Sequence, residues 1–111
     1  MGKIGIGVDI GCSHIYSAAV DLLKVKIIPG SCSNLKIDNK ACAEEILDGW
    51  SRAINKTILS INRIDLAGIG FAMPGPFDYT KGIALFERVE KYESLYGVNV
   101  SDELRQRLLL N

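Results

Sequence analysis

The chain has 111 residues, with 13 basic and 13 acidic side chains and therefore a formal net charge of zero. Its length predicts one domain, and 48% apolar residues are enough for a modest core. A neutral chain carries no large field of one sign, so neither nucleic acid nor an anionic membrane is an expected partner.

The sequence predicts neither a membrane span nor an export signal. Its apolar runs are shorter than the ~20 residues that a span needs, and its N-terminus has a strand pattern. Cys12, Cys32 and Cys42 are odd in number, and their spacing fits neither a disulfide framework nor a zinc site. We therefore expect a cytoplasmic protein with reduced thiols.

The first predicted element is a strand that begins at Lys3 and runs into a turn at residues 11–13. Alternate residues share a face of an extended chain, so one face is aliphatic and carries Ile4, Ile6, Val8 and Ile10. Asp9 projects from the other face, where its neighbours are glycines. Because glycine weakens a strand, this pattern indicates that a ligand or another backbone approaches there. An ordinary core strand with a bulge is the alternative.

The following segments predict a three-strand antiparallel meander. Residues 14–21 are rich in β-formers and are expected to pair with the first strand. Residues 24–28 alternate charged and aliphatic side chains and form the third predicted strand. Residues 31–39 are polar and irregular, which predicts a loop in which Asp38 or Asn39 caps the next element.

Residues 40–62 predict the one long helix. Apolar side chains recur there at helical spacing, at Ala43, Ile46, Leu47, Trp50, Ile54, Ile58 and Ile61. Gly49 costs this helix about 1 kcal/mol relative to alanine and is expected to let it lie close to the sheet. Trp50 is expected in the core rather than at a ligand.

A second apolar strand, at residues 66–72, follows the helix after a short turn and again contains two glycines. A helical crossover places such a strand parallel to a neighbour. The strand ends at a loop, residues 73–78, at the edge where open α/β sheets bind ligands. Two prolines, Pro74 and Pro76, stiffen this loop on either side of Gly75.

The rest of the chain predicts a turn at residues 81–82, a short strand at residues 83–86 and a last helix. Residues 87–93 are charged and receive no assignment. Ser101 is expected to cap the last helix, in which Leu104, Leu108 and Leu109 form an apolar stripe.

Three of these features, in this order, resemble the N-terminal domain of the ROK family of sugar kinases and sugar-responsive repressors. They are Asp9-x-Gly11-x-Ser13 after the first strand, the long helix after the meander, and Gly68-Ile69-Gly70-Phe71-Ala72-Met73-Pro74-Gly75-Pro76-Phe77-Asp78. The resemblance covers nearly the whole chain. It implies an α/β fold of the ribonuclease H-like, actin-like ATPase type, with three antiparallel strands, a crossover helix and parallel strands.

The resemblance also implies roles for particular residues. Asp9 would hold Mg²⁺ through water, and Gly11, Cys12 and Ser13 would face the phosphates of ATP. The alternative is that Asp9 has only a structural role and caps the hairpin. Gly75 and Pro76 would line the floor of a sugar pocket, and a rigid turn without a ligand is the alternative there.

Two further polar residues lie near these motifs, and neither is assigned a catalytic role. Asp78 is the carboxylate beside the Pro-Gly-Pro loop, and we interpret it as a turn residue that bonds its own backbone rather than as a base. His14, the only histidine, follows the turn and is interpreted as a strand-edge side chain.

The sequence departs from the family pattern in two ways. The first turn of the family has a second glycine and a threonine, where this chain has Cys12 and Ser13. The residues that the family uses as its catalytic Asp and zinc ligands would follow Asn111. We therefore expect residues 1–111 to be the N-terminal part of a two-domain kinase, to have no turnover alone, and to self-associate through the apolar face that meets the second domain.

Two alternatives stay open at this point. A sugar-binding ROK-type transcriptional regulator would need a DNA-binding segment before the first strand, where only Met1 and Gly2 stand. A non-catalytic family member would have a turn that no longer binds nucleotide. A sugar is the expected substrate in the kinase interpretation, and the sequence does not say which one.

Overall fold

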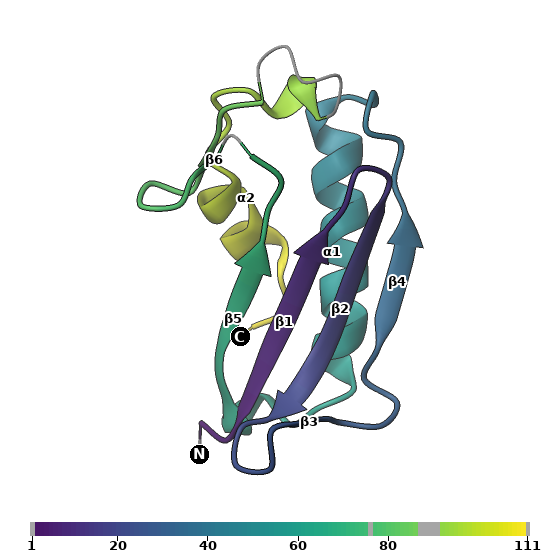
Figure 1. The fold of residues 1–111 in the computed structure, drawn as a ribbon, viewed down its shortest axis with the longest axis vertical. Helices are drawn as coiled ribbons and strands as arrows, with labels where there is room; N and C mark the ends of the chain where they lie inside the picture. The colour runs from purple at the N-terminus through teal and green to yellow at the C-terminus, as the bar shows by residue number, and fades with distance from the viewer. Residues whose placement is uncertain (1, 76, 87–91, 111) are drawn as a thin grey trace.

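In the computed structural model, which describes residues 2–75, 77–86 and 92–110, a five-stranded sheet lies against a long helix (Figure 1). The sheet consists of β1 (Ile4–Ile10), β2 (His14–Asp21), β3 (Lys26–Ile27), β4 (Ser33–Lys36) and β5 (Leu66–Ala72). The remaining elements are α1 (Ala43–Leu59), α2 (Val100–Arg107), the hairpin β6 (Phe77–Asp78) and β7 (Ile83–Ala84), and the 3₁₀ turns η1 (Arg63–Asp65) and η2 (Glu93–Leu95). The predicted mixed α/β class is confirmed.

Strand β1 lies in the middle of the sheet, antiparallel to β2 and parallel to β5. The predicted helical crossover, α1, connects the two halves and covers the aliphatic face of the sheet (Figure 1). The core therefore lies between this face and α1, and Ile6, Val8 and Ile10 are buried there. In the described part of the chain the opposite face of β1 stays open, and Gly7 and Asp9 are exposed on it.

The outer edge of the sheet differs from the predicted meander. The predicted third strand is only the two-residue β3, and Val25 just before it has a left-handed backbone with φ 53°. Residues 33–36, predicted as a loop, form β4 and pair with β2. The loop prediction was wrong because the buried residues of this segment are Ser31 and Ser33 as well as Ile37. The segment therefore lacks the alternation of apolar and polar residues that predicts a strand.

Helix α1 begins at Ala43, later than predicted, and its N-cap is Cys42 without a side-chain cap bond. The predicted caps have other partners. Asp38 accepts a backbone N–H within the preceding turn, and Asn39 donates its side-chain amide to the carbonyl of Cys12 at 2.6 Å. Both residues lie too far ahead of the first helical turn to cap it, so the cap prediction was wrong.

Two predictions about the interior of α1 are confirmed. Trp50 is fully buried and packs edge-on against Tyr92, with 5.2 Å between the ring centroids. At Gly49, a Cβ atom would lie only 2.7 Å from Cδ1 of Ile37. Glycine therefore lets α1 approach the β4 side of the sheet more closely than alanine would.

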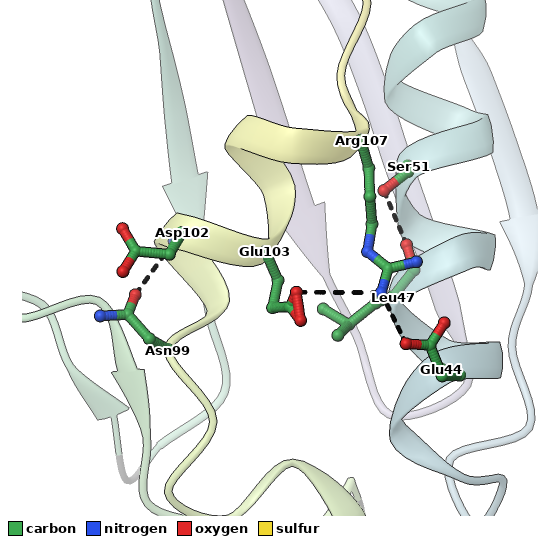
Figure 2. Close-up of polar contacts among 7 residues, drawn as sticks. All are labelled: Glu44, Leu47, Ser51, Asn99, Asp102, Glu103 and Arg107. Carbon is green, nitrogen blue, oxygen red and sulfur yellow. Dashed lines mark hydrogen bonds and ion pairs between the residues drawn. The ribbon is translucent and has the colours of Figure 1, made fainter.

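Helix α2 begins one position before the predicted cap, Ser101. Its N-cap is Asn99, whose side-chain oxygen accepts the N–H of Asp102 at 3.0 Å (Figure 2). Asparagine is a strong N-cap residue, and its position directly before the first turn decides between the two candidates. Leu104 is buried as predicted, whereas Leu109 lies beyond the end of the helix, is exposed, and does not belong to the apolar stripe.

The C-terminal end of α2 is tied to α1. Arg107 Nη2 lies 3.0 Å from Glu44 Oε1 and 3.9 Å from Glu103 Oε2 (Figure 2). The glutamates are solvent-accessible, so these ion pairs add little stability. Asn55 contributes more specific contacts, since it donates to the carbonyl of Arg107 at 3.1 Å and accepts the N–H of Leu109 at 2.8 Å.

Some sequence predictions concern surfaces and segments that the structure tests only in part. The unassigned residues 87–91 lie outside the described residues.

Within the described ranges, no helix is long and apolar enough to cross a membrane. Exposed apolar side chains gather where β2 leads into β3, at Leu22, Leu23, Val25 and Ile27. The expected self-association stays a prediction.

Candidate functional site

The carboxylate of Asp9 stands on the open face of the sheet, one residue before the end of β1. Its cross-strand neighbours are Tyr16 in β2 and Ala72 in β5. Within the described residues, no ion pair or hydrogen bond engages this carboxylate. A Cβ atom at Gly7 or Gly70 would meet nothing within 4 Å in that same part of the chain. The face around Asp9 is therefore bare, as predicted, and a depression of about 670 Å³ lies over it.

The turn after β1 is held by two distant segments of the chain, residues 37–39 and Tyr92. Three consecutive carbonyls accept one hydrogen bond each: Gly11 from the Tyr92 hydroxyl at 2.5 Å, Cys12 from the Asn39 side-chain amide at 2.6 Å, and Ser13 from the Ile37 N–H at 2.7 Å. Tyr92 and Asn39 are also joined to each other, since the Tyr92 N–H donates to the Asn39 carbonyl at 2.8 Å. The conformation of the turn thus depends on contacts outside the hairpin.

The side chains at the end of the turn interact locally. The Ser13 hydroxyl lies 3.2 Å from Nδ1 of His14, and both residues are partly buried. His14 is the first residue of β2, and its ring stacks on Tyr16 with 6.0 Å between centroids. This placement fits the predicted strand-edge role of the histidine.

The loop after β5 lies at the same edge of the sheet as the turn, because β5 runs parallel to β1. Gly75 is exposed, and a Cβ atom there would meet nothing within 4 Å in the described chain. The Tyr79 hydroxyl anchors the loop, since it accepts the N–H of Met73 at 3.0 Å and donates to the Met73 carbonyl at 3.1 Å. Pro76, the other predicted sugar contact, lies outside the described residues.

Asp78 is a turn residue, as predicted. Its Oδ1 atom accepts the N–H of Lys81 at 3.0 Å, and its carbonyl accepts the N–H of Gly82 at 2.8 Å. Gly82 has φ +71°, and a Cβ atom there would clash with Ser101 of α2. The carboxylate of Asp78 therefore stabilises the β6–β7 hairpin, which packs on α2.

Tyr92 connects the turn to the core and was not assigned from the sequence. It is fully buried and has a left-handed backbone with φ 53°. Burial raises the pKa of Tyr92 to about 12, the Trp50 indole N–H opposes this shift, and the Cys12 thiol adds to it. In the described part of the chain the buried Trp50 Nε1 has no acceptor in hydrogen-bond geometry, so its effect on the phenol is weaker than a full hydrogen bond.

The raised pKa of Tyr92 predicts a loss of stability at alkaline pH. The free side chain ionises at 10.0, whereas the folded chain retains this proton up to about pH 12. The folded state therefore binds more protons than the unfolded state in this window, and its stability falls as the pH rises through it. Urea unfolding at about pH 9 and about pH 11 should show a larger decrease for the wild type than for Tyr92→Phe. Equal decreases would contradict this assignment.

The described residues do not form a preformed metal-binding site. No three histidine, cysteine, aspartate or glutamate side chains among them lie close enough to share an ion. Mg²⁺ usually keeps several waters and binds through one or two carboxylates together with substrate phosphates. Among the described residues, Asp9 is the exposed carboxylate on the open face beside the turn.

A separate cleft of about 530 Å³ lies between β5 and α2. Ile69, Phe71 and Leu104 line it together with Arg63 and Arg105, and none of the described residues that line it carries a carboxylate. This cleft opens beside the buried side of β5, away from the exposed Asp9 face. The described lining therefore offers mainly apolar contact area, and no carboxylate that could act as a base.

The sequence and the fold were compared with those of known proteins. No family model matches the sequence, and no curated protein matches it. The crystal structure of a ROK family glucokinase from Streptomyces griseus, in complex with glucose and AMPPNP, matches 94% of this chain at 24% identity, with a TM-score of 0.67. This chain has the fold of a ROK sugar kinase domain.

Two other kinases share this fold. The inorganic polyphosphate/ATP-glucomannokinase of Arthrobacter sp. strain KM matches 95% of the chain at 22% identity, with a TM-score of 0.70. The ROK hexokinase of Thermus thermophilus matches 94% at 17% identity, with a TM-score of 0.57. The chain covers 30%, 40% and 32% of the glucokinase, glucomannokinase and hexokinase chains. It therefore spans less than half of each of these kinases.

Proposed function

We propose that residues 1–111 form the N-terminal domain of an ATP-dependent hexose kinase of the ROK family, with an actin-like ATPase architecture. The observation that carries this proposal is the common location of Asp9, the turn at residues 11–13 and the Gly75 loop, all at the carboxyl edge of β1 and β5. Open α/β sheets bind their ligands at this edge. The matched glucokinase, which was solved with glucose and AMPPNP, supports the same conclusion.

Phosphoryl transfer requires mainly positioning and the neutralisation of charge. In the proposed domain, the backbone N–H groups of Cys12 and Ser13 and the Ser13 hydroxyl bind phosphate oxygens of ATP. Gly11 was expected to face the phosphates as well, but its N–H donates to the His14 carbonyl at 2.8 Å and is engaged within the hairpin. Asp9 holds Mg²⁺ through water, and the ion, when bound, neutralises charge on the transferred group. The open position of the Asp9 carboxylate is what makes it available for this role.

The sugar is proposed to lie over the loop after β5. Because Gly75 has no side chain and faces open space in the described structure, a hexose ring can approach its backbone closely. Pro76 is proposed as the neighbouring contact. Asp78 is engaged in its own turn, so we assign it no role as a base.

The alternative of a sugar-binding repressor is not favoured, since the three structures described above are all kinases. A non-catalytic family member remains a rival with a specific cause, because Cys12 stands where the family has a second glycine. The Cys12 side chain leaves less space for a phosphate to approach the backbone of the turn than a glycine would. The backbone N–H groups of the turn are still present. Direct measurement of nucleotide binding separates the two.

Titration of the ¹⁵N-labelled chain tests the proposed function. Mg·AMPPNP is expected to shift the amide signals of residues 9–13, and glucose is expected to shift that of Gly75. Signals of Thr57, a buried residue near the C-terminal end of α1, serve as an internal control and should stay in place. If Mg·AMPPNP shifts amide signals elsewhere in the chain to saturation but not those of residues 9–13, the turn does not bind phosphate. If Mg·AMPPNP does not bind at all, the non-catalytic alternative is favoured.

A further inference from the structure

We propose that Tyr92 and Asn39 are positioning residues, which hold the turn at residues 11–13 so that its backbone N–H groups face a nucleotide phosphate. The proposal rests on the proposed function of the turn. It adds two residues from elsewhere in the chain, one before α1 and one at the start of η2, neither of which belongs to the sequence motif around Asp9.

The direction of the N–H groups follows from peptide geometry. In a trans peptide unit the carbonyl and the N–H point in opposite directions. The carbonyl of Gly11 shares a unit with the N–H of Cys12, and the carbonyl of Cys12 shares one with the N–H of Ser13. Both carbonyls point to the Tyr92 and Asn39 side chains. The two N–H groups therefore point away from that pair, on the side where successive N–H groups can form an anion-binding nest.

These carbonyl contacts are well placed to hold one conformation. Both are short, at 2.5 Å from the Tyr92 hydroxyl and 2.6 Å from the Asn39 amide. The backbone bond between Tyr92 and Asn39 at 2.8 Å joins the two donors, so neither can move independently. The ring of Tyr92 is fully buried between Trp50 and Phe86, and a hydrogen bond from such a ring is strengthened by its low-dielectric surroundings.

The backbone of Tyr92 points to the same conclusion. A left-handed conformation is unfavourable for a bulky side chain and persists only where the surroundings determine it. Here the ring packs in the core while the hydroxyl reaches a carbonyl 81 positions earlier in the chain. This combination fixes where the donor lies relative to the turn.

Two substitutions separate the hydroxyl from the packing. Tyr92→Phe keeps the buried ring and removes only the donor to Gly11, and Asn39→Ala removes the donor to Cys12. Ser94→Ala is the matched control, because this hydroxyl also belongs to η2 but donates to the carbonyl of Ala41 at 2.8 Å rather than to the turn. All three variants lose one hydrogen bond to a backbone carbonyl, and only two of them touch the turn.

The test measures amide signals of the free ¹⁵N-labelled chain and its affinity for Mg·AMPPNP, with urea unfolding measured alongside. Tyr92→Phe and Asn39→Ala are each expected to shift the Cys12 and Ser13 amides and to weaken nucleotide binding by about tenfold, the equivalent of about one hydrogen bond. Ser94→Ala is expected to change neither quantity, although it too loses a hydrogen bond. A tenfold loss without a matching fall in stability is a result that a purely structural role would not produce.

The outcomes distinguish this inference from the function on which it rests. If the wild-type turn responds to Mg·AMPPNP and Tyr92→Phe and Asn39→Ala both bind with wild-type affinity, positioning by this pair is refuted and the phosphate turn stands. An equal loss of affinity in Ser94→Ala would also refute it, since the effect would then be a general one. If the wild-type turn does not respond at all, the proposed function fails, and this inference fails with it.

Discussion

Replacement of Asp9 by asparagine is expected to weaken the binding of Mg·AMPPNP to this chain by about 10- to 100-fold, the usual loss when a group that orients the shell of a metal is removed. The carboxylate is exposed, and no described residue pairs with it, so the substitution should cost little folding stability. Asparagine keeps the size of the side chain and removes its charge. The loss of affinity therefore reports on the ion and the phosphates rather than on the fold.

The measurement is a titration with AMPPNP in the presence and in the absence of Mg²⁺. The wild type should bind more tightly with the ion, whereas Asp9→Asn should bind equally well in both conditions. Asp48→Asn is the control, because it neutralises another exposed carboxylate, on α1. A metal dependence that survives in Asp9→Asn would show that Asp9 does not hold the ion.

Trp50→Ala is expected to have the largest effect on stability, with a loss of about 3–5 kcal/mol in the free energy of unfolding. Trp50 is fully buried in α1 and packs against Tyr92, so truncation leaves a cavity at the centre of the core. A small domain has only about 5–15 kcal/mol of stability in total. The substitution should therefore remove a large part of the stability of the domain.

Urea unfolding followed by circular dichroism measures this loss. Leu59→Ala is the control, because this large apolar residue of the same helix is 68% exposed and should change stability by less than about 0.5 kcal/mol. Trp50→Phe should lie between the two, since it keeps a ring against Tyr92. A loss below about 1 kcal/mol in Trp50→Ala would mean that the core does not depend on this side chain.

The regular elements with a clear period could be predicted from the sequence. The alternation from Ile4 to Ile10 predicted β1 and the open face of Asp9, and the apolar spacing around Trp50 predicted α1. The glycine-rich segment after the helix was correctly predicted as a parallel strand, because a crossover of this length leaves few other connections. These features depend on neighbours within one element, so a local pattern is enough.

Other features could not be predicted because their cause is not local. β4 was missed because Ser31 and Ser33 are buried, and a buried serine is acceptable only when tertiary partners satisfy it. Ser31 meets this condition through the backbone of Ala19 and Ile28. The cap of α2 was assigned to Ser101 rather than Asn99, an error of two residues that a boundary estimate from periodicity does not resolve.

The sequence by itself determined that a strand ends in an aspartate and a small-residue turn, and that a long amphipathic helix returns the chain to a parallel strand. Only the tertiary structure decided how that turn is held. Tyr92 and Asn39 come from segments 81 and 27 positions away from the carbonyls that they bind. No period or motif links residues at such separations, because hydrogen bonds between them exist only after the core around Trp50 has brought the segments together.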